Sequence, residues 1–139
     1  MKNNNSVRVV IDTNVFVSAI ISGGSPRKVI DMIADETCTI VVAHELISDL
    51  KRIVTTKFPD FIEDLIRVEK LLERDALWVK LGSVRQVVSR DKDDDKFIET
   101  ALIGNCQYII SGDKDLLSLG TYRGIKIVKP AEFLKLGAD

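Results

Sequence analysis

Short apolar runs alternate along the chain with longer stretches whose apolar residues recur at helical spacing. The short runs are rich in Val and Ile and have the length of buried β-strands; they cover residues 7–11, 38–42, 107–110 and 125–128. Apolar residues recur as on one face of a helix over residues 15–21, 29–33, 46–54, 61–72 and 97–102. Strands that alternate with helices predict an α/β fold: a three-layer α/β/α sandwich around a central, mostly parallel sheet of about four to five strands.

Proline and other turn-forming residues mark the ends of these elements. Pro26 is expected to be the first residue of the second helix, and Pro59 to break the chain between two helices that form a helical hairpin. Residues 77–81 predict a weaker strand at an edge of the sheet. Near the end of the chain, residues 115–119 predict a short helix, and Pro130 begins a last one.

Composition is typical of a compact globular domain. Of the 139 residues, 45% are hydrophobic and 29% charged, which predicts a single domain over residues 1–139 with the polar residues 1–6 as a flexible tail. No apolar run has the length of a membrane span. Two cysteines without paired spacing predict reduced core thiols, so a cytoplasmic protein is expected. The net charge of −1 neither supports nor excludes a nucleic-acid substrate.

Acidic residues follow the apolar runs at four places that are far apart in the chain. They are Asp12, then Glu45 and Asp49 in one helix, then residues 91–95 at the start of another helix, and Asp113. The carboxyl ends of parallel strands meet at one edge of a sheet, where ligands bind near the point at which the strand order reverses. Carboxylates gathered there repel one another unless a cation neutralises them, so the pattern predicts one shared metal site.

Each acid taken alone has a simpler structural explanation. An Asp after a strand is a common helix cap, which would explain Asp12 or Asp94 without a metal, and Glu45 equally fits a solvated helix face. Asn14 and Ser111 could orient a carboxylate or a water, or serve only in turns. Several acids at one sheet edge favour the metal site, because uncompensated negative charge there would destabilise the fold.

Three segments together resemble the PIN domain family. They are Val9 to Ala19 with Asp12-Thr13-Asn14 at its centre, Asp94-Asp95-Lys96-Phe97-Ile98-Glu99, and Ile110-Ser111-Gly112-Asp113-Lys114-Asp115. The resemblance spans nearly the whole chain. It is closest to the toxins of bacterial and archaeal toxin–antitoxin pairs, a group related to VapC-type ribonucleases. It implies an endoribonuclease that uses Mg²⁺ or Mn²⁺ held by three or four acids at the carboxyl edge of the sheet.

The resemblance also assigns the residues of the site. The catalytic, metal-binding acids correspond to Asp12, Asp49, Asp94 and Asp113. Secondary candidates are Glu45, Asp95, Asp115, Asn14 and Ser111. Asp49 stands where the family usually has Glu, so Glu45, one turn earlier, could complete the site. The register of the third acid is also open, because Asp91 or Asp95 could replace Asp94.

The implied reaction is hydrolysis of RNA phosphodiesters by a metal-activated water, which would leave a 5′-phosphate and a 3′-hydroxyl. Hard oxygen ligands without a His or Cys cluster fit Mg²⁺ or Mn²⁺ and argue against zinc. The resemblance further implies an RNA substrate, a cognate antitoxin protein and a homodimer. No membrane partner is expected.

Two other functions are weighed against the nuclease. Asp12 at the end of the first strand also fits a phosphatase or phosphoacceptor that forms an aspartyl-phosphate. Asn14 argues against it, because it stands where such a phosphatase needs a second Asp as acid and base. The other alternative is a catalytically inactive PIN-like domain that only binds a partner, in which the acids are helix caps and solubilising charge. Metal-dependent stabilisation would separate this domain from the enzyme.

Overall fold

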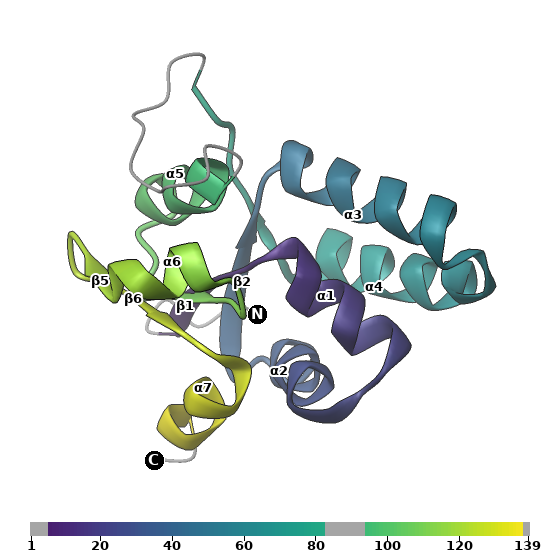
Figure 1. Ribbon diagram of the computed structural model, residues 1–139, viewed down its shortest axis with the longest axis horizontal. Coiled ribbons are helices and arrows are strands. Elements are labelled where there is room, and N and C mark those ends of the chain that lie inside the picture. The colour runs from purple at the N-terminus through teal and green to yellow at the C-terminus, as the bar shows by residue number, and fades with distance from the viewer. Residues whose placement is uncertain (1–5, 83–93, 138–139) are drawn as a thin grey trace.

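The computed structural model describes residues 6–82 and 94–137. The strands in these ranges are β1 (Val7–Ile11), β2 (Cys38–Val42), β3 (Leu77–Trp78), β4 (Tyr108–Ile110), β5 (Thr121–Tyr122) and β6 (Ile125–Val128). The helices are α1 (Thr13–Ile21), α2 (Gly24–Ala34), α3 (His44–Lys57), the 3-10 turn η1 (Pro59–Phe61), α4 (Ile62–Asp75), α5 (Asp95–Ile103), α6 (Lys114–Leu119) and α7 (Pro130–Gly137). The predicted alternation of strands and helices is confirmed (Figure 1).

The six strands form one sheet in the order β3-β2-β1-β4-β6-β5. All neighbouring strands are parallel except β5 and β6. The predicted α/β class and mostly parallel sheet are confirmed, with one strand more than expected. The additional strand, β5, is joined to β6 by a tight turn in which Arg123 and Gly124 have φ angles of 48° and 83°. Positive φ at both positions is typical of two-residue hairpin turns, but an Arg-Gly pair is a weak signal for one.

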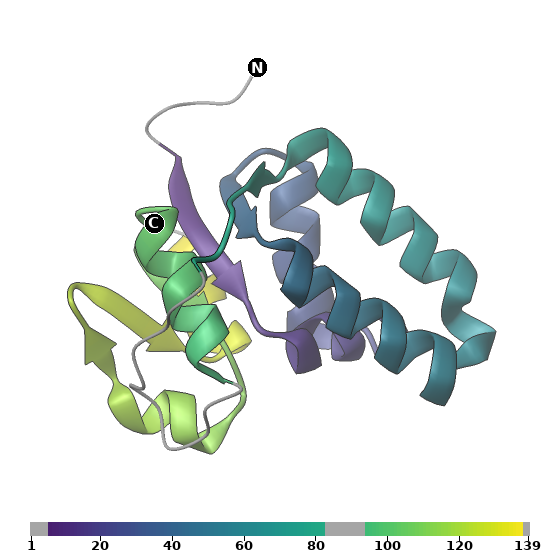
Figure 2. The same ribbon diagram turned by 90° about the horizontal axis from the view of Figure 1, so that it is seen from above.

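The strands bury alternate residues on the two faces of the sheet. In β1, Val9 and Ile11 join the core covered by α1, α2, α3, α4 and α7, whereas Val10 joins the core covered by α5 and α6. Figure 2 shows β1 between α5 on one side and the helices α1 to α4 on the other. Side chains alternate along a strand, so both cores can be filled only by a continuous apolar run. This explains why the central strands carry consecutive buried Val and Ile residues, as in Val9-Val10-Ile11 of β1 and Ile40-Val41-Val42 of β2.

Two element boundaries differ from the prediction by more than one residue. α2 begins at Gly24, so Pro26 is its third residue rather than its first. A proline is tolerated there because the N–H groups of the first turn have no partner within the helix. β3 ends at Trp78 rather than at residue 81, since the neighbouring β2 ends at Val42, where the chain turns into α3. β3 does lie at an edge, and α3 and α4 form the predicted hairpin.

The carboxyl ends of β1 and β4 lie side by side where the strand order reverses. β2 flanks β1 on one side, and β4 flanks it on the other. Beyond the strand ends, the Asp12 N–H donates to the Ile110 carbonyl at 3.0 Å, and the Ser111 N–H donates to the Val128 carbonyl at 2.9 Å. The backbone thus brings Asp12 and Ser111 to the crevice in which open parallel sheets bind their ligands.

Both cysteines lie in the core as free thiols, as predicted. Burial raises the pKa of Cys38 to about 11 and that of Cys106 to about 12, so both thiols stay protonated at neutral pH. Among the helices described, none combines the length and the apolar character of a bilayer span. The cytoplasmic location and the single-domain organisation remain predictions.

Candidate metal centre

Asp12 is anchored where β1 ends and α1 begins. Its Oδ1 accepts a 2.9 Å hydrogen bond from the Val15 N–H and caps the helix, while its Oδ2 accepts a hydrogen bond from the Ser111 hydroxyl. Asp12 is 3% exposed. Burial raises its pKa, the two hydrogen bonds oppose this shift, and the charge of Asp113 adds to it. Burial removes the ionised carboxylate of Asp12 from water, which costs free energy. A nearby cation would offset this cost.

Ser111 links Asp12 to the next acid along the sheet edge. Its hydroxyl donates to Asp12 and accepts a 2.9 Å hydrogen bond from the Asp113 N–H. The residue is fully buried, so packing holds this geometry in place. The two roles considered for Ser111, orienting a carboxylate and shaping the turn after β4, are therefore combined in one side chain.

Three carboxylates lie close enough to share one cation. Asp113 caps α6 by accepting a 3.0 Å hydrogen bond from the Leu116 N–H, and Asp115 lies in the first turn of the same helix. Asp94 immediately precedes α5. One oxygen from each of Asp94, Asp113 and Asp115 lies within 4.8 Å of the other two. The group consists only of carboxylates, and these hard ligands fit a hard divalent cation.

A cavity of about 250 Å³ adds acids from other elements to this group. Its lining includes the four acids predicted to be catalytic, Asp12, Asp49, Asp94 and Asp113. They come from the end of β1, from α3, from the start of α5 and from the turn after β4. Thr13 borders the same cavity, and in the described part of the chain its buried hydroxyl oxygen has no hydrogen-bond partner. Such an oxygen suits a site that takes up a polar ligand.

Asp49 reaches the cavity from α3, but its charge is already paired. Its Oδ2 contacts the Lys96 ammonium of α5, and its Oδ1 lies 3.7 Å from the Arg52 guanidinium. Lys96 also lines the cavity. Burial lowers the pKa of Lys96, and the charge of Glu45 opposes this shift. The sequence carries one signal for Lys96, its place directly after the acids of 91–95, but a pattern of acids alone does not select it.

Two secondary candidates, Glu45 and Asp95, belong neither to the carboxylate group nor to the cavity lining. Glu45 is exposed in the first turn of α3, one turn before Asp49. Asp95 is 4% exposed in the first turn of α5 and does not border the cavity either. Successive helical residues point about 100° apart, and of these two acids it is Asp94 whose carboxylate lies with those of Asp113 and Asp115. Asp91, the remaining alternative, lies outside the described residues.

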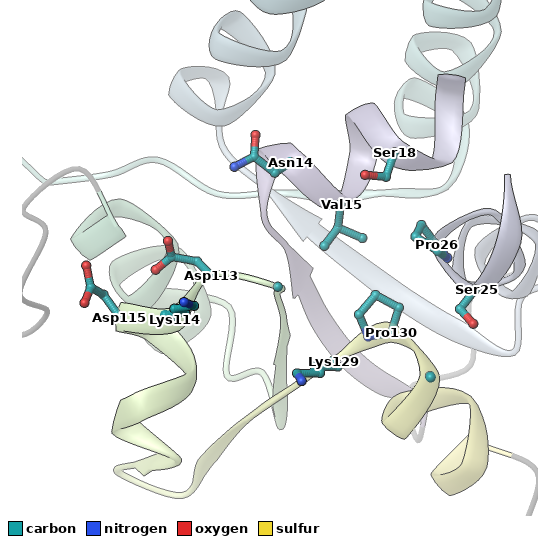
Figure 3. A pocket seen from close by; sticks show the side chains of 12 residues that line it. Asn14, Val15, Ser18, Ser25, Pro26, Asp113, Lys114, Asp115, Lys129 and Pro130 are labelled. Carbon is teal, nitrogen blue, oxygen red and sulfur yellow. The ribbon is translucent and has the colours of Figure 1, made fainter. Parts of the chain in front are cut away.

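A larger groove of about 840 Å³ adjoins the cavity, and Asn14 and Asp113 line both. Figure 3 shows Asp113 and Asp115 on one side of the groove and Ser25, from the first turn of α2, on the other. The lining also contains two lysines, Lys114 and Lys129. The groove therefore has an acidic end that suits a cation and lysine side chains that suit phosphate groups.

The strand order, the two helical layers and the acids at the reversal point define an α/β/α domain with a candidate metal site at the carboxyl edge of its sheet. The chain belongs to the PIN domain family, which its sequence matches over residues 8–115. It is also similar to the uncharacterized protein MJ1680 of Methanocaldococcus jannaschii. The two are 31% identical over 147 aligned positions, which cover 93% of this chain and 90% of that protein. The predicted family is thereby confirmed.

PIN domains are generally metal-dependent nucleases, so the family and the carboxylate group agree on the class of chemistry. Neither comparison concerns toxin–antitoxin pairs, an RNA target or a partner protein. The toxin role, the identity of the metal and the roles of the individual residues therefore go beyond the family assignment.

Proposed function

We propose that the protein is an endoribonuclease that depends on Mg²⁺ or Mn²⁺. The observation that carries this proposal is the group of Asp94, Asp113 and Asp115, whose oxygens lie within 4.8 Å of one another at the edge of a PIN-domain sheet. Like charges at this spacing destabilise the fold unless a cation neutralises them. These three residues would hold the ion, and Ser111 would keep Asp12 aligned with them.

The residues around the cavity would have different roles in phosphodiester hydrolysis. A divalent ion, when bound, supplies positive charge at the phosphate and lowers the pKa of a coordinated water. Asp12 is fixed by two hydrogen bonds and can orient the attacking water through a third. Lys114 and Lys129 in the adjoining groove would bind phosphates of the RNA strand. The products would carry 5′-phosphate and 3′-hydroxyl ends.

The proposal extends to a toxin that acts on RNA rather than DNA, pairs with a cognate antitoxin and forms a homodimer. This extension rests on the resemblance of the three motifs to PIN-family toxins. One feature is compatible with an antitoxin segment: a cavity of about 170 Å³ between α1, α2 and α4, lined by apolar side chains and by Arg27, Asp31, Asp64 and Arg67. An amphipathic helix with charges at matching positions would fit such a groove.

A cleavage assay with labelled RNA tests the nuclease proposal. The wild-type protein should cleave with Mn²⁺ or Mg²⁺ and stop when a chelator is added, and Asp94→Asn should be inactive. Asp60→Asn is the matched control, because it removes an exposed carboxylate in η1 and should keep full activity. Cleavage that continues in the chelator, or fragments that end in a 2′,3′-cyclic phosphate, would contradict the proposal.

A partner-binding domain without activity is the second candidate, and Asp49 is the observation that favours it. Asp49 stands where the family that this chain resembles usually has Glu, and it is paired with Lys96 and Arg52. An inactive domain should show the same melting temperature with and without Mn²⁺. The proposed enzyme should gain stability from Mn²⁺ and lose that gain in Asp94→Asn.

A further inference from the structure

The Lys96 ammonium is held inside the acidic cavity by contacts on more than one side. It contacts Asp49 Oδ2, and it lies 5.5 Å from the centre of the Phe97 ring, close enough for a cation–π interaction. All three residues line the cavity, and the Lys96 side chain is only 16% exposed. A solvated surface lysine has none of these restraints, so Lys96 is a fixed positive charge of the site.

The position of Lys96 in its helix is electrostatically unfavourable on its own. Lys96 is the second residue of α5, where the end of the helix already carries partial positive charge. Partial burial of an ammonium costs further free energy unless a carboxylate pairs with it. Asp49 of α3 provides that pairing, at a sequence separation of 47 residues. We therefore expect the positive charge of Lys96 to have a function in the site.

The acids that line the cavity have different partners. Asp12 accepts a hydrogen bond from Ser111, and Asp49 contacts an ammonium. Asp94 and Asp113 form, with Asp115 of the adjoining groove, the group that fits a divalent cation. Enzymes that hydrolyse phosphodiesters with two metal ions place the ions roughly 3.5–4 Å apart and need carboxylates for both. Asp49 is the cavity acid from a third helix that could serve a second ion, and Lys96 already engages one of its oxygens.

We propose that Lys96 takes the place of a second metal ion, so that the site binds one divalent cation per chain and presents the Lys96 ammonium to the RNA phosphate as its other positive charge. The inference rests on the proposed function, because it concerns the same site. A phosphate that enters the cavity competes with Asp49 for the ammonium. Lys96 would then offset charge that develops on the phosphate oxygens, beside the positive charge that an ion held by Asp94, Asp113 and Asp115 would supply.

The number of Mn²⁺ ions bound without RNA tests this inference, measured by native mass spectrometry and by calorimetric titration. The wild-type protein should bind one ion per chain. Lys96→Met removes the ammonium and keeps the apolar stem, so Asp49 should accept a second, weaker ion and the count should rise to two. Lys96→Met combined with Asp49→Asn should return the count to one. Lys96→Ala serves as a second variant if Lys96→Met fails to fold.

Arg52→Gln is the matched control. Arg52 also lies beside Asp49, but its side chain is 67% exposed, so its removal should leave the count at one. Two ions on the wild-type protein, or a single ion on the folded Lys96 variants, would overturn the inference and leave the proposed nuclease standing. A wild-type protein that binds no Mn²⁺ would overturn the metal-dependent function itself, so the two failures are distinguishable.

Discussion

The acidic cavity has two halves that are built differently. In the backbone-anchored half, Asp12 and Asp113 each cap a helix, and the Ser111 hydroxyl connects them. In the ion-paired half, Asp49 is held by the Lys96 ammonium. N–H and hydroxyl dipoles position a carboxylate without neutralising it, whereas an ammonium does both. On this comparison, a cation would bind at the backbone-anchored half, because the hydrogen bonds there leave the negative charge of the carboxylates in place.

Removing a carboxylate from the backbone-anchored half should have the largest effect. Asp113→Asn keeps a good helix cap, because Asn caps as well as Asp, but it removes a negative charge from the carboxylate group. Changes to groups that only support a metal ligand cost about 10- to 100-fold, so kcat/KM for RNA cleavage should fall by at least about 100-fold. Full activity in Asp113→Asn would show that the carboxylate of Asp113 is not needed for cleavage.

Ser111→Ala tests whether the backbone-anchored half acts as a unit. The change deprives Asp12 of a donor and the Asp113 N–H of an acceptor. Metal affinity should fall by about 10- to 100-fold, as measured by Mn²⁺ titration. The unsatisfied buried groups should also lower the free energy of unfolding by about 1–3 kcal/mol. Unchanged Mn²⁺ affinity would show that Ser111 only shapes the turn.

A substitution of Gly104, at the carboxyl end of α5, should destabilise the fold without weakening metal binding. A Cβ on Gly104 would lie 2.5 Å from Val41 Cγ1, and Val41 is a fully buried, β-branched residue that cannot easily give way. Gly104→Ala should therefore lower the free energy of unfolding in urea by about 1–3 kcal/mol, with Mn²⁺ affinity retained. If Mn²⁺ affinity fell here as much as in Ser111→Ala, the effect of Ser111 would be general destabilisation.

Asp12→Asn should have the smallest effect on stability, and one that depends on pH. Burial raises the pKa of Asp12 above its ordinary value of 3.8, so the folded state binds this proton more tightly than the unfolded chain does. Ionisation of Asp12 therefore lowers the free energy of unfolding as the pH rises from 3.8 through the raised pKa. Asn cannot ionise and still caps α1.

Thermal melts in metal-free buffer measure this difference. Asp12→Asn should melt slightly above wild type at pH 7, and the two should converge below pH 3.8. A variant that melts below wild type at pH 7 would mean that the hydrogen bonds from Ser111 and Val15 outweigh the desolvation of the carboxylate.

The elements that could be predicted from sequence are those with a local cause. Short runs rich in Val and Ile predict strands buried on both faces, and Pro59 marks the break in the α3–α4 hairpin. β5 could not be predicted, because two residues are too few to form a pattern. The start of α2 was wrong by two residues, because a proline fits several positions in a first helical turn.

The site is predictable to the extent that strand ends define it. Asp12 and Asp113 follow β1 and β4 closely, so a parallel sheet brings them together. The approach of Asp94 to Asp113 and Asp115 and the pairing of Lys96 with Asp49 depend on how α3, α5 and α6 pack. Such pairings join elements far apart in the chain, and no spacing rule encodes them.

A calorimetric Mn²⁺ titration of two matched variants, Asp113→Asn and Asp49→Asn, would show which half of the cavity holds the cation. Each removes one carboxylate from the same cavity, one from each half. Asp113→Asn should lose the ion, whereas Asp49→Asn should still bind one. Retained binding in Asp113→Asn together with lost binding in Asp49→Asn would contradict this expectation, because the ion would then belong to the half that Lys96 neutralises.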